Sequence, residues 1–100
     1  MHEYGLTERL LEVALAKAQA AGAERITALH IALGRDAGVA AAALRFYWPM
    51  VRADTPAAGA RLVIRRVAGD AVRLRAIDVP EPDDAPDGRP MAAATATERG

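Results

Sequence analysis

The chain has 100 residues, 13 basic and 13 acidic side chains, and no cysteine. This length predicts a single domain, and the lack of cysteine excludes disulfides, thiolate zinc sites and cysteine nucleophiles. A net charge of zero argues against a general binder of nucleic acid or acidic lipid, and no apolar stretch is long enough to cross a membrane. The N-terminus lacks the pattern of a signal peptide, so we expect a cytoplasmic location.

The first half of the chain predicts a helix, a strand and a second helix. Apolar residues recur at helical spacing over residues 7–21, and Gly22 is placed to end this helix. Alternation over residues 25–33 predicts a strand with one face toward the core. Residues 39–54 predict a helix that Pro49 must kink or divide, because proline lacks the hydrogen-bond donor of the helical ladder.

The second half predicts two strands and a tail. Residues 61–67 and 72–79 have strand patterns, and the short join over 68–71 predicts an antiparallel hairpin. The helix between the first two strands favours a parallel crossover. We therefore expect an α+β fold over residues 1–79, with two helices on one face of a three-stranded mixed sheet. Residues 80–100 are rich in Pro, Ala and Asp and predict a disordered tail.

The first three residues, Met1-His2-Glu3, form a candidate metal site. A free α-amine and the next amide nitrogen close a five-membered chelate ring, and the His2 amide with its own imidazole closes a six-membered one. Nitrogen-rich, square-planar sets of this kind favour Ni(II) or Cu(II). The site requires that nothing precede Met1, and we expect the bulky His2 to leave the initiator Met in place. Many chains begin Met-His, so an idle N-terminus is the alternative.

Motifs follow one another in a fixed order along the first four fifths of the chain. They are Met1-His2-Glu3-Tyr4, "ITALHIALG" over residues 26–34, Gly38-Val39 before "ALRF" over residues 43–46, and "TPAAGARLVI" over residues 55–64. Together they resemble the HypA/HybF family of hydrogenase nickel-incorporation proteins. The resemblance implies that the N-terminus binds Ni(II), with His2 and Glu3 matching the family motif residue for residue.

The same resemblance implies a function and partners. The chain is expected to be a nickel metallochaperone that acts in the maturation of a nickel enzyme, foremost a NiFe hydrogenase. Its implied partners are the hydrogenase large subunit or another nickel enzyme, and a nickel-handling GTPase. Neither nucleic acid nor a membrane is among the expected partners.

One departure from the family pattern is large. Family members insert a zinc domain with two CxxC pairs between the second and third strands. Here "LVIRRV" over residues 62–67 continues through residues 68–71 straight into "VRLRAIDV" over residues 72–79. We therefore expect a tight hairpin in place of the zinc domain and no zinc, so that the chain should fold without this metal.

Other residues are candidates for partner binding. Consecutive helical residues diverge by about 100°, so one side chain of residues 46–48 should point outward, and Tyr47 or Trp48 could anchor a partner. Arg65 and Arg73 belong to a basic hairpin, which fits either a solvated face or docking to an acidic protein. The alternative function is accordingly an adaptor subunit that carries no metal and binds a hydrogenase-related protein through this hairpin.

Catalytic chemistry has little support in the sequence. Paired carboxylates, a nucleophile with a base, and a Gly-rich phosphate loop are all missing from the pattern, so we expect no enzyme activity. His30 lies on the strand position opposite the core-facing Leu29 and Ile31, which favours a solvent-facing or partly packed histidine over a second metal ligand.

Overall fold

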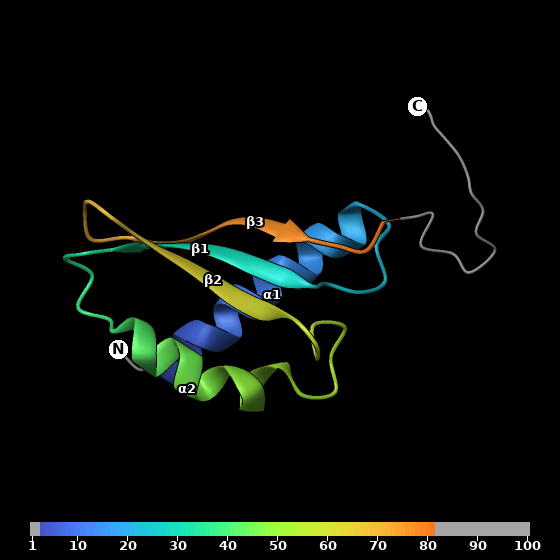
Figure 1. Cartoon of the computed structure of the whole chain (residues 1–100), viewed down its shortest axis with the longest axis horizontal. Helices are drawn as coiled ribbons and strands as arrows, with labels where there is room; N and C mark the ends of the chain where they lie inside the picture. The colour runs from blue at the N-terminus through green and yellow to red at the C-terminus, as the bar shows by residue number, and fades with distance from the viewer. Residues whose placement is uncertain (1–2, 82–100) are drawn as a thin grey trace.

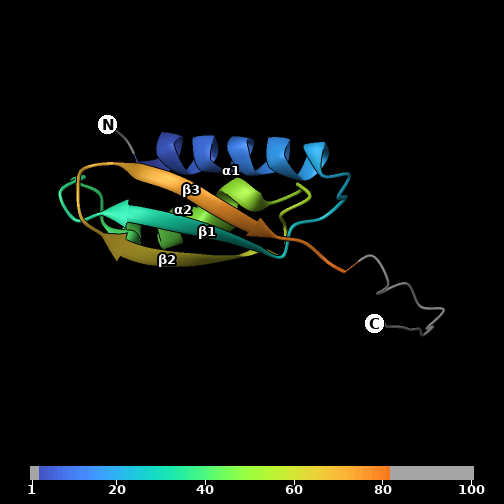
Figure 2. The same cartoon turned by 90° about the horizontal axis from the view of Figure 1, so that it is seen from above.

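The computed structural model describes residues 3–81, and the predicted tail from residue 82 onward lies outside this range. Two helices cover one face of a three-stranded mixed sheet and leave its other face open (Figures 1 and 2), which confirms the predicted α+β fold class. No helix among the described residues is long and apolar enough to span a membrane. The elements in chain order are α1 (Glu3–Ala20), β1 (Ala28–Gly34), α2 (Ala41–Arg52), β2 (Arg61–Val67) and β3 (Val72–Asp78).

Helix α1 begins four residues earlier than its apolar pattern predicts. Its fully buried residues are Thr7 and four apolar residues, and in the first turn only Leu6 packs against the core, partly buried. The helix ends as predicted at Gly22, whose φ of +73° is left-handed. The amide of Gly22 donates to the Gln19 carbonyl (3.0 Å) and that of Ala23 to the Ala18 carbonyl (2.9 Å), which is the Schellman arrangement.

Strand β1 lies at the centre of the sheet, in the order β2-β1-β3. It pairs in parallel with β2, as the helical crossover predicts, and antiparallel with β3. Leu29 and Ile31 are buried beneath the helices, as expected for the core-facing side of this strand.

The predicted hairpin of β2 and β3 is wrong, because these strands lie on opposite edges of the sheet. Residues 68–71 pass over the end of β1. Two backbone hydrogen bonds fix the connection there: the Gly34 amide donates to the Ala71 carbonyl (2.8 Å) and the Arg35 amide to the Val67 carbonyl (2.8 Å). Neighbouring strands are about 4.8 Å apart, so four residues are long enough to step across one strand.

Helix α2 packs on α1 and β2 and continues through Pro49 without being divided. It buries Leu44 and Trp48. The Trp48 indole Nε1 donates to the Ala60 carbonyl (2.8 Å), so the loop before β2 is fastened to the helix. This bond satisfies the only polar group of a side chain that is 5% exposed.

Candidate metal centre and partner-binding surfaces

The candidate metal site lies at the very start of α1. Glu3 is the first residue of the helix, and its carbonyl accepts a hydrogen bond from the Thr7 hydroxyl (2.6 Å). Met1 and His2 lie outside the described residues, so the geometry of the Met1-His2-Glu3 chelate stays a prediction. Within residues 3–81, no group of three or more His, Cys, Asp or Glu side chains gathers as a metal-binding cluster would.

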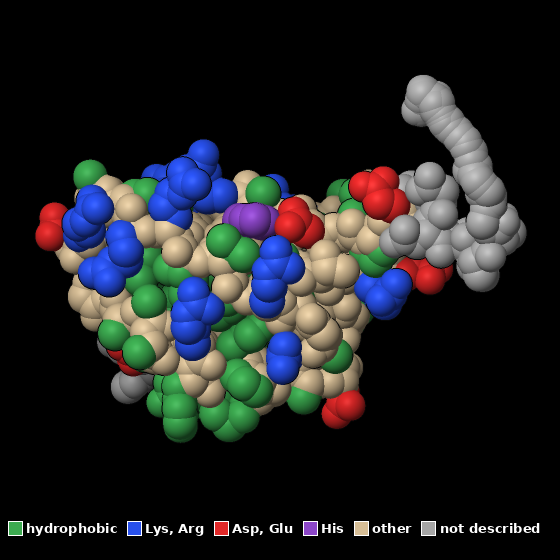
Figure 3. All heavy atoms as spheres, in the orientation of Figure 1, with side chains coloured by type: hydrophobic (Ala, Val, Ile, Leu, Met, Phe, Trp, Pro, Cys, Tyr) green, Lys and Arg blue, Asp and Glu red, His purple; other side chains and the backbone are tan. Residues whose placement is uncertain are grey.

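An exposed apolar patch lies beside the start of α1. Tyr4 stands edge-on to Tyr47 with ring centroids 5.4 Å apart, and Phe46 packs edge-on against the same ring at 5.1 Å. Phe46 is 69% exposed and Met50 is 53% exposed. We call Tyr4, Phe46, Tyr47 and Met50 the aromatic patch. Figure 3 shows apolar side chains gathered at the lower edge of the molecule, over α2.

The structure separates the two aromatic residues that the sequence offered as partner anchors. Tyr47 is partly exposed within the aromatic patch, whereas Trp48 belongs to the core and is not available to a partner in this fold. Phe46 is the outward-pointing residue of the run and was not among the predicted partner anchors. The helical period places Phe46 and Trp48 about 160° apart around the helix, but it does not show which of the two is buried.

The open face of the sheet is basic and includes both predicted arginines. Arg65 of β2 and Arg73 of β3 pair with the same residue of β1, Ala32, and both are exposed. A register shift adds a further residue to β3: His30 pairs with Ala76 and Ile31 with Leu74, so Arg75 has no counterpart on β1. This β-bulge leaves both Arg75 and Ala76 exposed, where strict alternation would bury one of them.

His30 also lies on the open face, as its strand position predicts. Its Nε2 is 3.0 Å from the Asp78 carboxylate, and the two side chains are 34% and 49% exposed. A pair this exposed contributes about 1 kcal/mol at most to stability. His30 therefore contacts one acidic side chain, on the face of the sheet away from the helices. This placement agrees with the expected solvent-facing or partly packed histidine.

A sequence profile of the protein family described as "Hydrogenase/urease nickel incorporation, metallochaperone, hypA" matches residues 1–73. The chain belongs to this family. The match includes all three residues of the N-terminal motif and ends inside β3.

Curated relatives agree with the family assignment. The chain is 49% identical over 67 residues to a hydrogenase maturation factor HypA of Synechococcus elongatus, covering 67% of this chain and 60% of the relative. It is 42% identical over 67 residues to the corresponding factor of Chloroflexus aurantiacus, covering 67% and 59%. The chain thus spans about three fifths of the length of the relatives it matches.

A solved structure has the same fold. The solution structure of the Ni metallochaperone HypA from Helicobacter pylori superposes with a TM-score of 0.70 at 13% identity, covering 79% of this chain and 97% of that chain. At this identity the likeness supports the arrangement of the two helices and the mixed sheet.

Proposed function

We propose that this chain is a metallochaperone that carries Ni(II) at Met1-His2-Glu3 and delivers it to a nickel enzyme, foremost a NiFe hydrogenase. The observation that carries the proposal is the family match, which begins at the motif itself. Nickel is the cargo of this protein, and the chain acts as a carrier rather than a catalyst. The receiving partner is the hydrogenase large subunit or another nickel enzyme, with a nickel-handling GTPase as co-worker.

The start of α1 constrains the chemistry of the proposed site. A helix N-terminus carries a partial positive charge, which disfavours a nearby cation by about 0.3–1 kcal/mol. Deprotonated amide nitrogen and the Glu3 carboxylate offset that repulsion by adding negative charge to the site. The chelate rings bind the metal. The positive end of the helix makes the affinity for nickel slightly lower than the same ligands would give without a helix.

We expect one Ni(II) per chain, bound through the Met1 amine, the His2 amide and imidazole, and a Glu3 group. Binding should weaken as the pH falls, because the amine, the imidazole and the amide must all lose their protons to coordinate. Calorimetric titration of Ni(II) into the untagged chain at several pH values measures both the stoichiometry and this dependence.

Three variants locate the site. His2→Ala should abolish binding, and so should one residue added before Met1, since the addition converts the amine into an ordinary amide. His30→Ala is the matched control, because it removes the other histidine from the open sheet face and should leave binding unchanged. Equal binding by the untagged and extended chains, or no binding by either, would remove the support for a nickel carrier.

A further inference from the structure

The open face of the sheet concentrates positive charge that the described chain does not balance. Within residues 3–81, no arginine of this face lies within ion-pair distance of an acidic side chain, and the Asp78 carboxylate contacts His30 instead. Like charges close together on one surface create a positive potential that an anionic partner relieves. The residues that carry this charge are all exposed arginines at the two edges of the face: Arg61, Arg65, Arg73 and Arg75.

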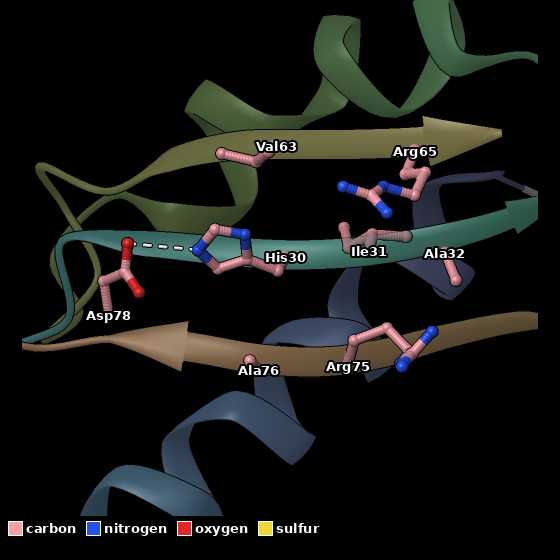
Figure 4. A pocket seen from close by; sticks show the side chains of 8 residues that line it. All are labelled: His30, Ile31, Ala32, Val63, Arg65, Arg75, Ala76 and Asp78. Atoms are coloured by element: carbon pink, nitrogen blue, oxygen red, sulfur yellow. Dashed lines mark hydrogen bonds and ion pairs between the residues drawn. The ribbon is translucent and has the colours of Figure 1, made fainter.

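A shallow pocket lies within this charged face. Its volume is about 270 Å³, and Arg65 and Arg75 line it from the two edge strands. Figure 4 shows these two side chains on either side of β1, with the small Ala32 near them and His30 with Asp78 toward the other end. The β-bulge exposes Ala76 together with Arg75, so that both neighbours line the pocket.

We propose that this pocket binds a carboxylate side chain from an acidic segment of a protein partner, held between Arg65 and Arg75. A guanidinium presents two parallel N–H donors that match the two oxygens of a carboxylate. The pocket is at the small end of the range for ligand sites, which begins at roughly 300 Å³, and has room for one side chain. Its lining from Val63 and Ala76 provides apolar contact for the methylene groups that carry such a carboxylate.

The surroundings of the pocket favour an acidic protein segment over a nucleic acid. Single-stranded nucleic acids stack their bases on aromatic rings, but the four aromatic residues of this chain lie in α1 and α2, on the covered side of the sheet. Arg73 and Arg75 are alternate residues of β3. Alternate side chains of an extended chain repeat every ~6.6 Å, so the acidic side chains of an extended peptide have a matching spacing. A second carboxylate of the same segment would therefore come near Arg73. None of these observations involves the nickel site, so the two proposals stand or fall separately.

The test is a titration of a blocked hexaglutamate peptide into the chain of residues 1–100, followed by two-dimensional NMR of the backbone amides at low salt. We expect shifts at Ala32, Val63 and Ala76, and binding that weakens as salt is added. Arg65→Gln and Arg75→Gln should each weaken binding at least fivefold. Arg66→Gln is the matched control, since it removes an exposed arginine from the same strand that does not line the pocket.

A second variant tests the pocket by filling it. Ala76→Glu introduces a carboxylate at an exposed position of the lining and should block the peptide without removing any arginine. A hexaglutamine peptide should not bind. The proposal fails if Arg66→Gln weakens binding as much as Arg65→Gln, or if inorganic phosphate or a short DNA duplex binds more tightly than the peptide. It also fails if only a chain ending at Glu81 binds, because the acids of residues 83–87 would then be the occupant.

Discussion

Gly34 ends β1 directly beneath the connection that carries the chain from β2 to β3. A Cβ atom built on Gly34 would lie 2.8 Å from the Ala71 carbonyl oxygen and closer still to that of Gly69. Both contacts are with backbone, which cannot rotate away as a side chain can. The absence of a side chain at this one position therefore allows the connection to cross β1.

Gly34→Ala should destabilise the protein by about 1–3 kcal/mol, the usual range for forcing an extra methyl into a closely packed site. The matched control is Gly5→Ala, at a position inside α1 with no atom within 4 Å of the added Cβ. That variant should gain up to about 1 kcal/mol, because alanine is the better helix former. Urea unfolding of the two variants measures both signs, and equal effects would contradict the role given to Gly34.

Phe46 and Trp48 show how far the sequence could predict which side chains of α2 are exposed and which are buried. The helical period required that one of the three consecutive aromatic residues point outward, and the structure has Phe46 exposed and Trp48 buried. The period alone did not identify which one. The deciding group is the Ala60 carbonyl, which accepts the indole N–H and comes from a loop twelve residues further along the chain.

At the scale of elements, α2 tolerates a proline three residues before its end. Pro49 cannot donate to the carbonyl of Arg45, so one bond of the helical ladder is missing. The buried contacts of Leu44 and Trp48 hold the helix together across this gap.

Pro49→Ala should stabilise the protein by about 1–2 kcal/mol, the restored donor being partly offset by the greater freedom of the unfolded chain. Pro56→Ala is the control, because Pro56 lies in a loop where no helical bond is lost. It should lose about 0.4–1 kcal/mol through unfolded-state entropy alone. Thermal unfolding of both variants gives the comparison, and a loss in Pro49→Ala would mean that the ring itself packs in the fold.

The strand pairing marks the limit of prediction at this scale. The extent of β2 and the parallel pairing of β1 with β2 follow from the residue pattern and the helical crossover. The short connection favoured a hairpin, and that inference failed because a four-residue segment can also step over one strand. The sequence did contain a signal: β1 carries a single polar side chain, His30, whereas β2 and β3 each carry several charges. The most apolar strand is the one expected at the centre.

Across the whole molecule, a net charge of zero hides an uneven distribution. The open sheet face carries four arginines, whereas residues 81–87 contain four acids. The sequence predicted basic strands but not the pocket between them, because the bulge in β3 exposes both Arg75 and Ala76, which strict alternation would place on opposite faces. Long-range features such as this register shift depend on how strands meet, and no single segment encodes them.

Residues 3–81 form a continuous hydrophobic core among themselves. Among residues 3–81, the buried residues come from α1, α2, β1, β2 and the loops before these two strands, and β3 adds partly buried apolar residues, of which Ile77 is the last. The composition of the C-terminal segment offers little apolar surface to add to this core. A chain ending at Glu81 should therefore melt within about two degrees of the full chain, as measured by circular dichroism. A loss of about ten degrees, which corresponds to more than 1 kcal/mol for a domain of this size, would show that the segment packs against the domain.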